Sequence, residues 1–138
     1  AYLIGFIFSI LLINIYKWNP GLSPFFIILL LWYPCYENLF SIFRKNILKK
    51  SAMSPDAKHV HQLIFFFIYK RYRLTFFQSN IFTSQTINTY NFLIMLIALN
   101  FISNSKIQIS LIMFNIMFYN LIYLKLFKYK YTKNFNIK

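Results

Sequence analysis

Long apolar stretches separated by polar connections dominate the hydrophobic pattern of the chain. Four of them, residues 1–16, 24–43, 83–103 and 107–127, carry almost no charge. About 20 helical residues cross the roughly 30 Å of a membrane's hydrocarbon core, so each stretch is close to the length of a span. The pattern therefore predicts an all-α, polytopic membrane protein with four transmembrane helices in a single membrane domain.

Composition agrees with this fold class. Hydrophobic residues make up 59% of the 138 residues and charged residues only 12%, whereas about a quarter of the residues in a soluble domain are charged. The net charge of +13 would ordinarily suggest a nucleic-acid partner, because Lys and Arg neutralise phosphates. The chain offers no exposed soluble face for such binding, so we expect membrane lipid and no nucleic acid as a partner.

The placement of the basic residues predicts the topology. Eight of the 15 Lys and Arg residues lie in the connection 44–82 and five lie from Lys125 onward, whereas the two short connections hold one each, Lys17 and Lys106. Cytoplasmic loops near span ends gather Lys and Arg. We therefore expect the loop 44–82, the basic tail 128–138 and both chain ends to be cytoplasmic, with most of the cations acting as orientation anchors.

The second apolar stretch contains two unusual residues. Pro34 lacks an amide donor and should kink or break the helix. Glu37 follows it, and a carboxylate inside a membrane is costly unless it is paired or near the interface. Two interpretations remain open: Glu37 marks a substrate path, or it makes a structural contact with a basic residue such as Arg44.

Candidate binding residues gather in the central loop. The segment Ser54-Pro55-Asp56 is typical of a helix start, and His59 and His61 follow it among many cations. No third His is available for a zinc site, and a phosphate-rich, anionic ligand suits the surroundings better. Arg44, where the second span meets the loop, is a further ligand-contact candidate. The alternative is that both His residues are interfacial polar residues without a role. The apolar run Leu63 to Tyr69 is too short to span a membrane and predicts an interfacial helix.

Two motifs in this half of the chain resemble a known family. They are Tyr-Pro-x-x-Glu-x-Leu-Phe-Ser-x-x-Arg from Tyr33 to Arg44, and Pro-Asp-x-x-His-x-His from Pro55 to His61. Together with AYLIGFIFSILL at the start, they resemble the C-terminal part of polyprenyl-phosphate sugar-1-phosphate transferases, in the branch of bacterial undecaprenyl-phosphate N-acetylglucosamine-1-phosphate transferases. The resemblance covers Ala1 to about Tyr69.

The resemblance implies a multi-spanning enzyme of the bacterial cytoplasmic membrane that serves the synthesis of cell-envelope polysaccharide. Such an enzyme moves a sugar-1-phosphate from a UDP-sugar to a polyprenyl phosphate and releases UMP. It implies that His59 and His61 contact the nucleotide sugar or its phosphates, with Asp56 as an orienting partner. Many relatives carry a further His where this chain has Gln62.

The family's paired aspartates and its Gly-Asp-x-Gly motif, which serve Mg²⁺ and catalysis, have no counterpart in this chain. We therefore expect a C-terminal portion that holds no catalytic residue and no metal ligand, with Mg²⁺ bound by residues outside this chain. Such a portion would be inactive alone and would need the N-terminal part of the enzyme, or a second copy, as its partner. The alternative function is a small, non-enzymatic membrane accessory protein whose basic loop binds lipid or another protein.

Overall fold

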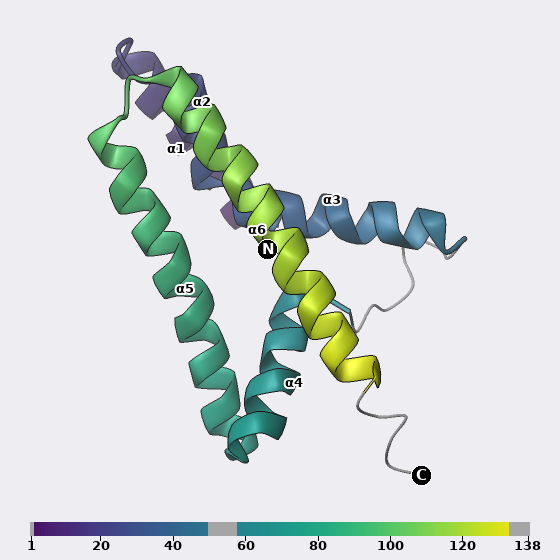
Figure 1. Ribbon diagram of the computed structural model, residues 1–138. Coiled ribbons are helices and arrows are strands. Elements are labelled where there is room, and N and C mark those ends of the chain that lie inside the picture. The colour runs from purple at the N-terminus through teal and green to yellow at the C-terminus, as the bar shows by residue number, and fades with distance from the viewer. Residues whose placement is uncertain (1, 50–57, 133–138) are drawn as a thin grey trace.

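Helices account for nearly all of the part of the chain that the computed structural model describes, residues 2–49 and 58–132 (Figure 1). In chain order, these ranges form six helices: α1 (Tyr2–Trp18), α2 (Pro24–Leu30), α3 (Trp32–Ile47), α4 (Val60–Tyr72), α5 (Phe76–Asn100) and α6 (Ser105–Thr132). The all-α fold class predicted from the sequence is confirmed.

The two longest helices, α5 and α6, form an open hairpin that organises the other elements (Figure 1). At the closed end of the hairpin α2 packs against both helices, and α1 lies against α2. At the open end α4 packs between α5 and α6. Helix α3 projects sideways from the bundle (Figure 1). The first turn of α4 thereby comes to lie beside α3, although the two are separated in sequence.

A single proline explains why α2 and α3 are two helices. Their axes differ by 69°, and α2 ends at Leu30, which lies four residues before Pro34. A proline ring clashes with the carbonyl of that residue and offers no N–H to it. Regular hydrogen bonding resumes when Cys35 N donates to Leu31 O at 3.2 Å. The break predicted at Pro34 is confirmed, and it falls one turn before the proline itself.

A buried amide fixes the turn of the α5–α6 hairpin. Gln108 is fully buried, and its Nε2 donates to Ala98 O and to Phe101 O, both at 2.9 Å. These carbonyls lie at the end of α5, where each also accepts one backbone hydrogen bond, from Phe101 N and Asn104 N respectively. Ser23, the N-cap of α2, donates its amide to Ile102 O at 3.0 Å, so α2 is tied to the same turn.

One apolar core joins α2, α4, α5 and α6 at the base of α3. Its members are Phe26, Leu29, Trp32, Val60, Leu63, Ile94, Ala98, Tyr119 and Tyr123. Outside this core, large apolar side chains are exposed along most helices, including Phe6, Ile13, Phe43, Phe92 and Leu121. Exposed apolar area of this extent marks surfaces that contact something other than water.

By length and composition, α6 is the one described helix that suffices to cross a membrane, over Ser105–Tyr131, and the bent pair α2–α3 passes the same test as a broken span. Only 22% of the apolar window of α6 is buried, whereas a core helix of a soluble protein would be mostly buried. Of the other predicted spans, 1–16 overlaps α1, and 83–103 begins inside α5 but runs past its end at Asn100 into the following turn. The run Leu63 to Tyr69 is helical, as predicted, and forms the middle of α4.

Candidate functional site

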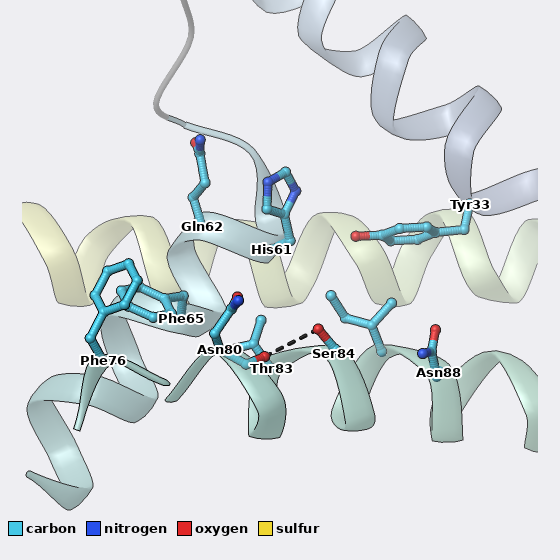
Figure 2. A pocket seen from close by; sticks show the side chains of 10 residues that line it. Tyr33, His61, Gln62, Phe65, Phe76, Asn80, Thr83, Ser84 and Asn88 are labelled. Atoms are coloured by element: carbon cyan, nitrogen blue, oxygen red, sulfur yellow. Dashed lines mark hydrogen bonds between the residues drawn. The ribbon is translucent and has the colours of Figure 1, made fainter. Parts of the chain in front are cut away.

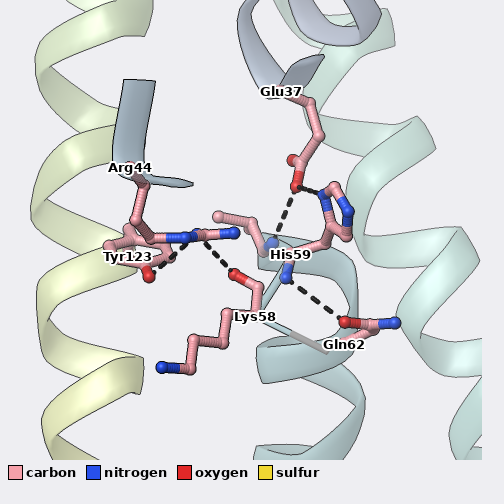
Figure 3. A network of polar contacts seen from close by, with 7 residues as sticks. Glu37, Arg44, Lys58, His59, Gln62 and Tyr123 are labelled. Atoms are coloured by element: carbon pink, nitrogen blue, oxygen red, sulfur yellow. Dashed lines mark hydrogen bonds and ion pairs between the residues drawn. The ribbon is translucent and has the colours of Figure 1, made fainter. Parts of the chain in front are cut away.

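Glu37 links α3 to the beginning of α4. Its side chain is buried, and Oε1 accepts a hydrogen bond from Val60 N at 2.9 Å and lies 3.0 Å from His59 Nδ1 (Figure 3). An ionised carboxylate only accepts, so His59 Nδ1 carries the proton and donates it. The amide of Val60 is one of the first N–H groups of α4, which have no intrahelical acceptor. Glu37 therefore caps α4 from another helix and fixes the orientation of the His59 ring.

Arg44 makes a second link, two helical turns after Glu37 on the same face of α3. Its Nη1 donates to Lys58 O at 2.8 Å and to Tyr123 Oη at 2.9 Å (Figure 3). Its guanidinium also lies over the rings of Phe40 and Tyr123. Arg44 thus holds residue 58, while Glu37 holds residues 59 and 60. One of the two interpretations left open by the sequence was a structural contact between Glu37 and a basic residue such as Arg44; in the structure Glu37 contacts His59.

Gln62 completes the start of α4. Its Oε1 accepts a hydrogen bond from His59 N at 3.2 Å, so this side chain closes back on the residue that begins the helix. Glutamine three residues after an N-cap is typical of this arrangement. At the position where the resembled family often has a further His, this chain carries a residue with a capping role.

His59 and His61 lie together although they are two residues apart. Their ring centroids are 5.5 Å apart with an interplanar angle of 17°. On a regular helix the two side chains would diverge by about 200°, but His59 has an extended backbone, with φ −68° and ψ 149°, and only His61 is helical. The extended backbone of His59 therefore lets the two rings lie together. With Nδ1 of His59 held by Glu37, Nε2 is the atom left for a ligand.

Two lysines approach the same region from the loop and from the end of α6. Lys58 Nζ lies over the rings of Phe127 and Tyr131, at 5.7 and 5.5 Å from their centroids. Lys130 Nζ lies over Tyr131 as well, at 5.7 Å, and over Phe66 at 5.5 Å. A cation is attracted to an aromatic face when it lies within about 6 Å of the ring centroid. Arg44, Lys58 and Lys130 therefore form a positive region along the aromatic side chains of α6, and Lys58 joins this region to His59 through the backbone.

Behind the His pair three buried oxygen atoms face one another. Glu37 Oε2, Tyr33 Oη and Tyr119 Oη have no hydrogen-bond partner among the described residues. Both hydroxyls lie close enough to the Glu37 carboxylate to interact with it electrostatically. The carboxylate is thus surrounded by potential donors on one side and tied to α4 on the other.

A cavity of about 510 Å³ opens on the other side of His61, between α4 and α5 (Figure 2). The ring of Tyr33 borders it at one end and Phe65 and Phe76 at the other, as Figure 2 shows. The remaining wall comes from polar side chains of α5, among them Asn80, Ser84 and Asn88. The volume lies within the range of about 300–1,000 Å³ that is usual for small-molecule sites.

The sequence-predicted residues are therefore partly brought together. Glu37, Arg44, His59 and His61 meet at the α3–α4 junction, while Asp56 lies outside the described residues. Within residues 2–49 and 58–132, no group of three or more His, Cys, Asp or Glu side chains gathers to hold a metal ion. Glu37, the carboxylate in these ranges, has Oε1 engaged by His59 and Val60. The described residues do not form a Mg²⁺ site.

Four residues of this region were not predicted as site residues: Lys58, Gln62, Tyr123 and Lys130. Gln62 had a local signal, because it stands three residues after a helix-starting His59. Lys58 adjoins His59 in sequence, but a lysine in a basic loop is most simply an orientation anchor. Tyr123 and Lys130 reach the site only because α6 packs on α4, which no local pattern indicates.

Comparison of the chain with protein-family models, with curated proteins and with solved structures found no match.

Proposed function

We propose that the chain is the C-terminal portion of a membrane transferase that passes a sugar-1-phosphate, N-acetylglucosamine-1-phosphate in the first instance, from a UDP-sugar to undecaprenyl phosphate. In that reaction a phosphate oxygen of the lipid attacks the sugar-bound phosphorus. The bond between the two phosphates of the donor breaks, UMP leaves, and a new pyrophosphate joins sugar and lipid. This portion would contribute binding and positioning, with catalysis supplied by the rest of the enzyme.

The observation that carries the proposal is the contact between the two motifs on which the family resemblance rests. Glu37 and Arg44, from the first motif, hold three residues within the second, which are Lys58, His59 and Val60. If the two motifs matched the family only by chance, there would be no reason for them to contact each other in the fold. The interlocking gives both motifs one shared task, which is to present the His pair at the start of α4.

The charges of the region suit the phosphates of such a donor. Arg44 holds the carbonyl of Lys58, the residue before His59, and Lys58 and Lys130 both lie over the ring of Tyr131. Phosphoryl transfer depends mainly on positioning and on neutralising charge around the phosphates. The described residues offer no carboxylate cluster of the kind that binds Mg²⁺. In this proposal Mg²⁺ is held by the aspartates of the remaining part of the enzyme.

A membrane location is supported by the exposed apolar surface and by the length of α6. Placing α1, α2–α3, α5 and α6 as spans puts the α3–α4 junction, with 13 of the 15 cations, on the cytoplasmic side. A UDP-sugar is a cytoplasmic substrate in this scheme, and α4 lies at the interface where it meets the lipid-borne acceptor. Both chain ends are cytoplasmic in the same arrangement.

The test is reconstitution from two parts. The chain is expressed in a bacterial membrane together with the N-terminal part of a polyprenyl-phosphate N-acetylglucosamine-1-phosphate transferase that carries the aspartate motifs. UMP release from UDP-N-acetylglucosamine, with Mg²⁺ and undecaprenyl phosphate, should appear only when both parts are present. The Arg44→Ala and His61→Ala variants should abolish it, whereas Lys17→Ala, an exposed cation on α1, should not.

Release of UMP by the chain alone would contradict the proposal. Failure of the unsubstituted chain to restore activity, while a matched C-terminal part of the authentic enzyme does restore it, would also contradict it. That second result favours the alternative, a membrane accessory protein whose basic region binds lipid or another protein.

A further inference from the structure

The N-terminal half of α5 is rich in uncharged polar residues, which neither a membrane span nor an amphipathic surface helix requires. Between residues 78 and 91 there are ten Asn, Gln, Ser and Thr residues and no charged one. Polar side chains within a span are costly and usually face a cavity or another helix. Here, Asn80, Thr83, Ser84 and Asn88 line the cavity of about 510 Å³ between α4 and α5 (Figure 2).

The described residues of this wall offer no ionic partner to a charged ligand. Among the residues that the structure describes, those lining the cavity include no Lys, Arg, Asp or Glu, although the chain has 15 basic residues. A phosphate or carboxylate would therefore gain no charge-assisted hydrogen bond from a Lys or Arg among them. Lys58 and Lys130 instead lie over Tyr131 of α6, on the side of α4 that faces α6.

The same wall suits an uncharged ligand that is rich in hydroxyl groups. Asn80 and Asn88 each present an acceptor oxygen and a donor NH₂, which is what a hydroxyl group needs because it both donates and accepts. The Ser84 hydroxyl donates to Asn80 O at 3.1 Å, so its lone pairs remain as acceptors. At one end Phe65 and Phe76 meet edge to face, with centroids 5.0 Å apart, and offer apolar area for the C–H face of a ring.

We propose that this cavity binds a sugar ring, of the neutral hexose or N-acetylhexosamine class. The assignment rests on the proposed function insofar as the sugar is taken to be that of the nucleotide-sugar donor. His61 connects the two regions, since it lines the cavity and stacks on His59. A donor whose phosphates lie beside the His pair therefore has its sugar directed between α4 and α5, onto Asn80, Ser84 and Asn88.

The experiment is saturation-transfer NMR on the full 138-residue chain in lipid nanodiscs. Nanodiscs are preferred because alkyl-glycoside detergents carry a sugar headgroup that would compete. Two probes are used, free N-acetylglucosamine and UDP-N-acetylglucosamine, whose sugar and uridine protons report separately. Asn88→Leu replaces a polar side chain of the wall with an apolar one. Asn80→Leu makes the same replacement at the end of the cavity nearer Phe76. Gln85→Leu is the matched control, because Gln85 is an exposed amide on α5 that does not line the cavity.

We expect the sugar protons of both probes to be saturated by the unsubstituted chain. Loss of paired hydrogen bonds in either cavity variant should raise the Kd of N-acetylglucosamine about tenfold, with Gln85→Leu within twofold of the unsubstituted chain. Circular dichroism and elution as a single species establish that each variant is folded. If one cavity variant misfolds, the other, which changes a separate side chain, decides the result.

The outcomes separate this inference from the proposed function. Saturation of the uridine protons without the sugar protons overturns the sugar site and leaves donor binding intact. Equal effects of Asn88→Leu and Gln85→Leu, or no saturation of any sugar proton, also overturn it. Free sugar binding that depends on Asn88, combined with no uridine signal and no effect of UDP, supports the sugar site and counts against the transferase.

Discussion

The link between Glu37 and the start of α4 makes the most specific prediction for stability. Glu37→Ala removes the acceptor of two hydrogen bonds, from Val60 N at 2.9 Å and from His59 Nδ1 at 3.0 Å. Val60 is buried, and a buried amide left without a partner costs about 1–3 kcal/mol. The bond from His59, whose side chain is 23% exposed, adds about 1 kcal/mol. The free energy of unfolding should therefore fall by about 2–4 kcal/mol.

Glu37→Gln separates the hydrogen bonds from the charge. Its amide oxygen can still accept from Val60 N, so most of the hydrogen-bonding contribution is kept. The negative charge at the positive N-terminal end of α4 is lost, which is worth about 0.3–1 kcal/mol in a typical helix. We expect Glu37→Gln to be destabilised by about 1 kcal/mol. Asn38→Ala is the matched control, because Asn38 is the exposed neighbour of Glu37 on α3.

Two measurements check this order. Denaturant unfolding in micelles should rank the unsubstituted chain and Asn38→Ala above Glu37→Gln, and Glu37→Gln above Glu37→Ala. Hydrogen exchange should show the amide of Val60 exchanging about 30-fold faster or more in Glu37→Ala, since each 1.36 kcal/mol corresponds to a factor of ten. Slow exchange at Val60 in Glu37→Ala, or a Glu37→Gln variant as unstable as Glu37→Ala, would refute the capping role of this carboxylate.

Three further variants test other parts of the fold and site. Arg44→Lys keeps the charge, but a lysine cannot contact both Lys58 O and Tyr123 Oη while stacking on two rings. We expect the free energy of unfolding, measured with denaturant, to fall by about 1–2 kcal/mol. An unchanged free energy of unfolding would contradict this role. Gln108→Leu leaves the carbonyls of Ala98 and Phe101 without this donor and should cost about 2 kcal/mol in the same assay, whereas the exposed Met113→Leu should cost little. Pro34→Ala removes the cause of the 69° bend between α2 and α3. Spin labels at the exposed Ile28 and Leu39 should then move apart toward the spacing in a continuous helix, about 16 Å between backbones. An unchanged distance would show that packing alone bends the chain.

Features governed by local sequence were predictable. The helix break follows from Pro34 because a proline acts on a carbonyl four residues away, and the helical run from Leu63 to Tyr69 follows from its apolar composition. The continuity of 83–103 as an apolar span was a less accurate expectation. Helix α5 is longer than that range, and its polar first half keeps it out of the helices that are apolar enough to cross a membrane alone.

The pairing of Glu37 could not be predicted, because it depends on how α4 packs. Glu37 and Arg44 lie two turns apart on one face of α3, so a contact between them was one local expectation. Both side chains instead turn to the segment from Lys58 to Val60, which lies beside α3 only because α4 inserts between α5 and α6. The contribution of Tyr123, from the far end of the chain, has the same origin.

A consequence of this arrangement is that ligand position and fold stability are coupled at the α3–α4 junction. The Glu37 carboxylate both caps α4 and holds the ring of His59. The Arg44 guanidinium holds the carbonyl of Lys58, the residue that precedes His59. A phosphate drawn to Arg44 competes with Lys58 O for the same N–H groups, so binding would loosen one link while the Glu37 link retains the His pair. Because the proposed sugar cavity lies beyond His61 and has no Lys, Arg, Asp or Glu among its described lining residues, it would keep its geometry when the phosphate region rearranges. In the proposed complex, the neutral and ionic parts of the donor would therefore be recognised by separate walls that share only the first turn of α4.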